Sequence, residues 1–301
     1  MRRSFFVILS RATICSLLSL TLLSIPAESQ ATDVERHLRD QYQGKTLLLR
    51  GFLSGYRLHY GATGLPDKPR SGDWTEDGFV EVGDISLSGQ RLAIKAKRLF
   101  VVAGQGLGFH FVADSPKRTK RAPSLEISAE LGSAGSPSEQ VEAAMSRIFL
   151  TTEDAFAELV PAYWKPCVPD GLSGKDSDCH FSPQISVVPG VASTGPRNPA
   201  TENTPRPAVT HVGAGVSPPG IIRQQDPKLS DAADAADVRG TVILMLVVDA
   251  SGVPQNIRVV RPMGCGLDLQ AVRAVGSWRF DPAEKDGRPV AVEIAVEARF
   301  Q

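Results

Sequence analysis

The stretch from Arg239 to Phe300 has the clearest pattern of apolar and polar positions in the chain. Residues 241–248 are apolar at almost every position, which is typical of a central strand with both faces covered. The next residues, Asp249 to Gly252, favour a hairpin turn, because a glycine adopts positive φ at no steric cost. Residues 257–261 are then predicted to form the return strand.

An amphipathic helix and a final strand complete this stretch. Apolar residues at helical spacing begin at Leu267 and end at Trp278, and Asp268 lies in the first turn, where the helix dipole favours a carboxylate. From Val290 onward, large apolar positions alternate strictly with small or charged ones, which predicts a strand with one packed and one solvated face. The apolar set is Val290, Val292, Ile294, Val296, Ala298 and Phe300, and the intervening set is Ala291, Glu293, Ala295, Glu297 and Arg299.

Three strands and a helix in this order predict a small two-layer α+β unit with a three-stranded sheet. The return strand and the last strand are joined through a helix, so we expect them to run parallel, with the first strand between them. The last strand then lies on an edge, where its unpaired main-chain groups are a template for another strand. Two interpretations stay open: the edge pairs with a second copy of the chain, or it binds an extended peptide by strand addition.

The same region contains many sequence landmarks in a fixed order. They are Pro227, Ala232, Gly240-Thr241-Val242, Asp249 with Gly252, Arg258-Val259-Val260, Gly264 with Gly266-Leu267-Asp268, Trp278-Arg279-Phe280, Pro282-Ala283, and Lys285-Asp286-Gly287 with Pro289-Val290. Through these landmarks, residues from about 216 to 301 resemble the TonB C-terminal domain.

This resemblance implies a function for the edge strand. A TonB C-terminal domain is a periplasmic module that binds a short segment of an outer-membrane transporter beside its last strand, and a proton-powered inner-membrane motor drives transporter opening. It implies no catalysis. Arg258 and Arg261 are predicted to flank the bound segment. The peptide-binding edge itself is predicted to consist of Val290, Ala291, Val292, Glu293, Ile294, Ala295, Val296, Glu297 and Arg299.

The N-terminus has the features of an export signal. Arg2 and Arg3 precede an apolar stretch that ends at Ile25, and Ser29-Gln30-Ala31 offers small residues for a signal peptidase. We therefore expect residues 1–31 to be a signal peptide; the alternative is an uncleaved inner-membrane anchor. Either case predicts a periplasmic location for the rest of the chain.

Residues 32–182 are predicted to form a β-rich domain of unknown function. Short β-type runs separated by turns rich in Gly, Ser and Asp suggest a twisted antiparallel sheet or a small barrel. Asp33 to Gln43 is a candidate helix. Ser136-Pro137-Ser138-Glu139 predicts the start of a second one, with Ser136 as N-cap and Glu139 closing a capping box.

Residues 183–219 contain eight prolines in thirty-seven positions, interleaved with Gly, Ser, Thr and Asn. A segment of this composition cannot build a core, so it is predicted to be a linker that precedes a C-terminal domain at 220–301.

Four cysteines are present. Cys167 and Cys179 flank a short polar loop and are the predicted disulfide pair in an oxidising compartment. His180 is adjacent, but no CxxC or HxxxH spacing accompanies it, so no metal site is predicted. Cys265 lies between two glycines without a neighbouring base and is predicted to be unreactive.

Composition and motifs narrow the function classes further. The formal net charge of the 301 residues is zero, which favours neither nucleic acid nor an anionic membrane as a partner. The five histidines are scattered, and no GxSxG, HExxH or Walker motif occurs, so neither an enzyme nor a cofactor is predicted. The prediction is a periplasmic TonB-family protein that binds a transporter segment, with an inner-membrane motor as a further partner. The alternatives are a homodimeric structural adaptor of the envelope and an envelope enzyme in the N-terminal domain.

Overall fold

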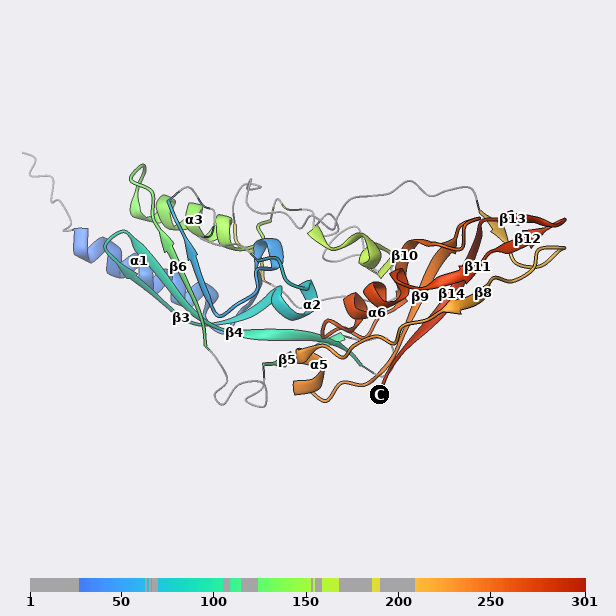
Figure 1. Cartoon of the computed structure of the whole chain (residues 1–301). Coiled ribbons are helices and arrows are strands. Elements are labelled where there is room, and N and C mark those ends of the chain that lie inside the picture. Colours follow the sequence, from blue (N-terminus) through green and yellow to red (C-terminus); the bar gives the residue numbers. More distant parts are fainter. Residues whose placement is uncertain are drawn as a thin grey trace, which may run out of the picture.

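The computed structural model describes residues 27–62, 64, 66, 70–104, 109–114, 124–152, 154, 159–167, 186–189 and 209–301. Their elements form two α+β units that lie end to end in an elongated molecule (Figure 1). The predicted signal or anchor segment, apart from its last residues, lies outside the described ranges. None of the described helices is long and apolar enough to cross a membrane.

The N-terminal unit is built on a six-stranded sheet. Its order is β1-β3-β4-β6-β2, and β5 pairs with the second half of β4, so the sheet is open rather than closed into a barrel. All pairs are antiparallel except β2 with β6. The strands are β1 (Thr46–Leu48), β2 (Arg57–Tyr60), β3 (Phe79–Ser88), β4 (Arg91–Ala103), β5 (Phe109–Ala113) and β6 (Leu125–Glu130).

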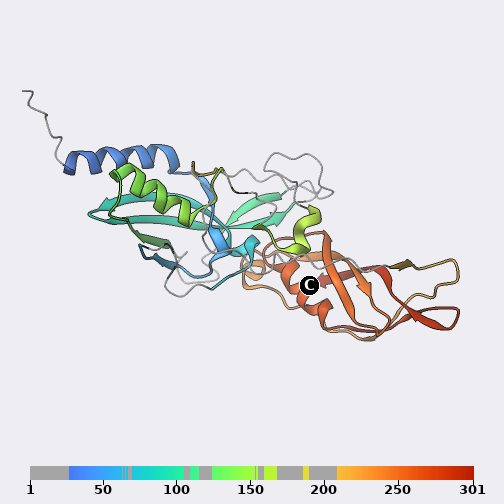
Figure 2. The ribbon, with the colours of Figure 1, turned by 90° about the horizontal axis from the view of Figure 1, so that it is seen from above.

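Two amphipathic helices, α1 (Ala27–Tyr42) and α3 (Pro137–Ile148), cover one face of this sheet (Figure 2). The predicted capping box is confirmed: Glu139 N–H donates to Ser136 Oγ at 3.4 Å, and Ser136 N–H donates to Glu139 Oε2 at 2.7 Å. Apolar residues of both helices, among them Leu38 and Met145, pack on the strands in one core. The two helices therefore cover the apolar face of the sheet.

The C-terminal unit is a four-stranded sheet of order β10-β9-β14-β7. As expected, β9 lies between the return strand and the last strand and is antiparallel to both. The helix α6 (Leu267–Gly276) buries Leu267, Ala271 and Val275 in the adjoining core. The strands are β7 (Thr210–His211), β9 (Gly240–Val248), β10 (Pro254–Arg261) and β14 (Val292–Phe300).

Two further strand pairs, of which only the second is a hairpin, and a short helix extend this unit. β8 (Gly220–Arg223) pairs with β11 (Arg279–Asp281), and β12 (Ala283–Lys285) pairs with β13 (Arg288–Val290). The short α5 (Asp231–Ala235) is capped by Ser230. Val290, predicted as the first residue of the last strand, is instead the end of β13, where it pairs with Ala283.

The strand β7 was not predicted, and it changes the expected three-stranded sheet. Thr210 and His211 belong to the segment that the sequence assigns to the linker, yet they pair in parallel with Val292 and Glu293. Further along the same segment, Ser217 N–H donates to the carbonyl of Glu284 at 2.9 Å. The last part of the proline-rich segment therefore lies on the C-terminal unit, while residues 190–208 fall outside the described ranges.

The two units meet directly, at the end of β4 and at the loop before α6. Cys265 N–H donates to the carbonyl of Val101 at 2.7 Å, and Ala103 N–H donates to the carbonyl of Met263 at 2.9 Å. Gly264 lies between these bonds with φ +77°, and a Cβ there would come within 1.9 Å of the Val101 oxygen. Only glycine fits so close an approach.

A core shared by both units surrounds this contact. It contains Trp74 of α2 (Trp74–Asp77) and Trp164 of η2 (Ala162–Cys167), whose rings meet edge to face at 4.7 Å between centroids. The short 3₁₀ segment η1 (Arg50–Phe52) adds Phe52, and β10 adds Val259. The units are thus joined by packed apolar surface as well as by the chain between them.

Candidate functional site

The candidate site is the outer edge of β14. The predicted alternation is present: Val292, Ala298 and Phe300 are buried, whereas Ile294 and Val296 are half-buried against the core. Of the intervening side chains, Ala295, Glu297 and Arg299 are exposed, whereas Glu293 is half-buried. The strand therefore presents a partly open apolar face next to its edge, which an added strand would cover further.

The two sides of β14 differ in how far they are paired. On the inner side, β9 pairs with all nine residues, from Val292 opposite Val248 to Phe300 opposite Gly240. On the outer side, β7 pairs only with Val292 and Glu293. The prediction of a fully unpaired edge is therefore wrong for the first residues of the strand.

The direction of the main-chain groups follows from one hydrogen bond. Thr210 N–H donates to the carbonyl of Ala291 at 2.9 Å, so the main-chain groups of Ala291 point outward. Because a strand has a period of two, those of Glu293, Ala295, Glu297 and Arg299 also point outward. Within the described part of the chain, no strand pairs with the last three, so six main-chain groups are available for an added strand.

A polar groove of about 520 Å³ lies at the far end of this edge. One wall is the end of β14, and the other is the segment from Gln224 to Pro227, which Trp278 holds through a 2.9 Å hydrogen bond from Nε1 to the carbonyl of Gln225. Pro227 and Trp278 are among the sequence landmarks of this region, but no groove was predicted from them. The groove is lined by Gln224, Asp226, Pro227, Trp278, Glu297, Ala298, Arg299 and Gln301.

The two arginines predicted to flank the edge lie elsewhere. Both belong to β10, which β9 separates from β14. Arg258 reaches across the sheet face and forms a 2.8 Å ion pair with Glu293, and both side chains are largely buried. Arg261 is exposed at the end of β10. Of the charged residues considered, Arg299 does border the edge, where it pairs with Glu297 at 2.9 Å.

Cys167 and Cys265 are the cysteines that lie in the described ranges. Cys167 is disulfide-bonded, but Cys179 lies outside those ranges, so the pair Cys167–Cys179 stays a prediction. Cys265 is a buried free thiol. Burial and the nearby carboxylates of Glu76, Asp268 and Asp73 raise its pKa to about 12, so it carries no thiolate at neutral pH.

Two fully buried carboxyl groups lie at the junction of the units. Asp268 accepts hydrogen bonds from Met263 N–H and Gly264 N–H, both at 2.8 Å, which fixes the loop before α6. Asp73 belongs to the N-terminal unit and accepts from Thr75 and from the hydroxyl of Tyr163. Burial raises the pKa of Asp268 to about 7, outweighing the two N–H donors, and it also raises the pKa of Asp73.

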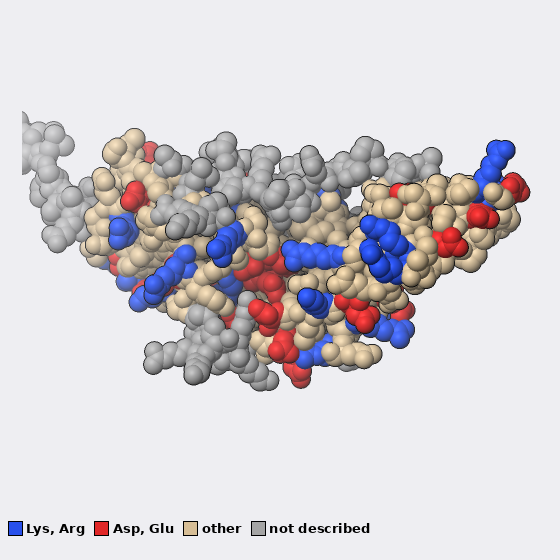
Figure 3. Space-filling view, in the orientation of Figure 1, with Lys and Arg blue, Asp and Glu red and all other residues tan. Residues whose placement is uncertain are grey.

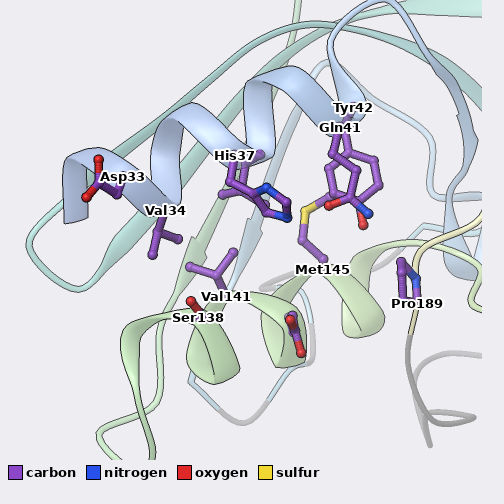
Figure 4. A pocket seen from close by; sticks show the side chains of 11 residues that line it. Asp33, Val34, His37, Gln41, Tyr42, Ser138, Val141, Met145 and Pro189 are labelled. Atoms are coloured by element: carbon purple, nitrogen blue, oxygen red, sulfur yellow. The ribbon is translucent and has the colours of Figure 1, made fainter. Parts of the chain in front are cut away.

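The N-terminal unit has a groove of about 400 Å³ between α1 and α3 (Figure 4). Its floor contains Leu38, Val141 and Met145, which are already buried in the core, and its rim carries His37 and Glu142. Ser138 also lines the groove, but in the part of the chain that the structure describes no hydrogen bond joins it to His37, as a nucleophile and its base would require. Among the described residues, no group of three or more His, Cys, Asp or Glu side chains could hold a metal ion.

The distribution of charged side chains on the visible surface does not favour any one class of binding partner. Basic and acidic side chains are interspersed on the face shown in Figure 3, with acidic ones gathered near the middle of the molecule and basic ones on both sides. Among the described residues on this face there is therefore no extended positive patch of the kind that binds nucleic acid.

Comparison with known proteins decides the family of the C-terminal unit. The model of the Gram-negative bacterial TonB protein C-terminal family matches residues 225–301. Those residues form a TonB C-terminal domain. Protein TonB of Vibrio cholerae serotype O1 is 31% identical over 88 residues, which are 29% of this chain and 36% of that protein. The chain thus matches about a third of the length of this relative.

The solution NMR structure of the Pseudomonas aeruginosa TonB C-terminal domain is also similar. It has 20% sequence identity and a TM-score of 0.24, and the match covers 30% of this chain and 89% of that domain. The residues N-terminal to 225 lie outside the family match. The family match therefore begins within the segment Gln224–Pro227 that forms one wall of the polar groove.

Proposed function

We propose that this chain is a periplasmic TonB-family protein that binds an extended segment of an outer-membrane transporter by strand addition. The bound segment lies along the outer edge of β14 and pairs with Ala295, Glu297 and Arg299. The observation that carries the proposal is the set of outward main-chain groups at these residues, next to half-buried Ile294 and Val296. The family match supports the transporter as the partner.

The size of the edge sets the strength of the complex. Six outward main-chain groups give at most about six hydrogen bonds, each contributing roughly 1 kcal/mol net. Ordering an extended segment costs part of this free energy, so we expect a weak complex that dissociates readily. The polar groove at Gln224–Pro227 then receives the end of the segment and adds side-chain selectivity.

The deciding variant is Ala295→Pro. A proline there removes one outward N–H, whereas the groups of Ile294 and Val296, which face β9, keep their ladder bonds. Ala295→Val is the matched control, because it keeps the N–H and favours a strand. The probe is a set of overlapping ten-residue peptides that covers the periplasmic segments of outer-membrane transporters from the same organism.

In titration calorimetry with these peptides we expect at least tenfold weaker binding for Ala295→Pro and unchanged binding for Ala295→Val. Equal affinity of the wild type and Ala295→Pro would refute the site. The proposal of an inner-membrane motor as a further partner requires either that residues 1–31 stay attached as an anchor or that a separate motor-bound protein contacts this chain. The N-terminal residue of the mature protein distinguishes the two, since cleavage after Ala31 removes the anchor and leaves only the route through a separate partner.

The same open edge supports a second function, self-association in a structural adaptor. Two copies can pair their β14 edges antiparallel, using the same outward groups. Sedimentation velocity of the full chain separates the two functions. A dimer that persists at excess peptide and dissociates in Ala295→Pro would favour the adaptor, and a monomer that binds peptide favours the transporter partner.

A further inference from the structure

We propose that the linker strand β7 is a built-in competitor that holds part of the β14 edge and is displaced when a partner strand binds. This inference rests on the proposed function, because it concerns regulation of the same edge. It is carried by the pairing of β7 with Val292 and Glu293, on the side of β14 where a partner would add.

The contact of β7 is of the kind that a ligand strand would make. Thr210 N–H donates to the carbonyl of Ala291 at 2.9 Å, and the register continues to His211 opposite Glu293. The side chain of Thr210 is half-buried and that of His211 is exposed. The pairing therefore depends mainly on the main chain, so a partner of different sequence can replace it.

The chain after β7 keeps this contact short. Gly213, Ala214 and Gly215 all have positive φ, and Gly213 and Val216 exchange hydrogen bonds of 3.2 and 3.1 Å, so the chain reverses. Ser217 then binds Glu284 through two hydrogen bonds of 2.9 Å. The turn prevents β7 from continuing beyond Glu293, and the residues that would follow it along the edge remain open.

Two states of the edge follow from this arrangement. With β7 in place, a partner strand can pair only with Ala295, Glu297 and Arg299. With β7 displaced, the outward groups of Ala291 and Glu293 become available as well, and the partner can extend along the whole strand. Because Ser217 keeps the linker close, β7 competes at a high effective concentration.

The energetic effect is modest, because β7 pairs over only two residues. If its pairing contributes about one net hydrogen bond, it lowers the apparent affinity for a long partner strand about fivefold. This competition selects for partners that can pair along more of the edge, since a short one gains nothing from displacing β7.

The test compares two substitutions at one residue. Thr210→Pro removes the N–H that donates to Ala291, whereas Thr210→Ala keeps it. A second variant, V209G/T210G/H211G/V212G, weakens the strand without a proline. Hydrogen–deuterium exchange at the Glu293 amide, which faces β7, reports whether β7 has left the edge. The probe is the ten-residue peptide that binds wild type best.

We expect faster exchange at Glu293 and about fivefold tighter peptide binding in Thr210→Pro and in the glycine variant, with Thr210→Ala unchanged. Unchanged exchange in both releasing variants would show that β7 does not cover the edge, and it would overturn the inference. Faster exchange at Glu293 with unchanged peptide affinity would also overturn the inference, because β7 would then leave the edge without affecting binding. The proposed function would still stand in that case. If no peptide binds any variant, the proposed function itself fails.

Discussion

The TonB C-terminal domain has two borders that differ in how completely they are closed. At the inner border, the loop Met263–Gly266 bonds to the end of β4 and to Thr75, and the surrounding side chains are buried. At the outer border, the edge of β14 is paired over two residues and open over the next ones. One small sheet thus has one border that is closed by the neighbouring unit and another that stays largely open. The difference lies in close backbone approach and buried side chains.

The largest expected effect comes from breaking the inner border with Gly264→Val. Its Cβ would meet the Val101 oxygen at 1.9 Å, so the loop and β4 must separate. We expect a loss of more than about 3 kcal/mol in the free energy of unfolding, measured by urea denaturation. Gly287→Val is the matched control, because Gly287 has φ +73° with nothing within 4 Å and should lose only about 1–2 kcal/mol from strain. Equal losses would show that the close approach is not needed.

A smaller effect is expected from Asp268→Asn at the same border. The pKa of Asp268 is raised to about 7, so the folded state keeps a proton that the unfolded chain loses near pH 4. The contribution of this group to stability is therefore present below about pH 4 and is lost as the pH rises toward 7. Asparagine cannot titrate, and it leaves either Met263 N–H or Gly264 N–H without an acceptor, at a cost of about 2 kcal/mol.

The measurement is the free energy of unfolding of both proteins between pH 5 and pH 8. We expect Asp268→Asn to be more destabilising at pH 5 than at pH 8. The facing groups Asp73, Glu76, Tyr163, Cys265 and Arg273 are the same in both proteins, so the difference reports the titration of Asp268 together with its coupling to Asp73. A difference that stays constant with pH would contradict a raised pKa.

The smallest effect is expected near the outer border, from Arg258→Ala. It removes the 2.8 Å ion pair and leaves the largely buried Glu293 without this partner, which should cost about 1 kcal/mol. The exposed Arg261 is the control on the same strand, and Arg261→Ala should change the free energy of unfolding by less than about 0.5 kcal/mol. Peptide affinity should be nearly unchanged in both, since neither side chain borders the outer edge. A large loss of peptide affinity in Arg261→Ala would show that Arg261 does flank the bound segment.

The sequence predicted those parts of the C-terminal domain that depend on local pattern. The hairpin of β9 and β10, the helix α6 and the alternation along β14 all follow from periods and turn residues within one stretch. Asp268 was correctly placed in the first turn of its helix. Its buried bonds to Met263 and Gly264, however, depend on how the N-terminal unit covers the loop.

The features that were missed depend on contacts between distant residues. β7 consists of two residues in a segment rich in proline. It is a strand only because it pairs with β14, 82 positions later in the chain. Arg258 was assigned to the wrong side because strand pairing alone does not show that its side chain crosses β9 to reach Glu293. In the N-terminal unit, the parallel pairing of β2 with β6 likewise joins segments that no turn connects.

The position of β4 in both cores determines how a pulling force would pass through the molecule. Its first half contributes Leu92, Ile94 and Ala96 to the core under α1 and α3, and its second half contributes residues 99–102 to the core shared with the TonB C-terminal domain. A pull on a segment attached to β14 would pass through β9 and β10 to the Met263–Gly266 loop, and from there into this one strand. The load would enter the N-terminal unit along the axis of its longest strand, so the linker would carry little of the tension.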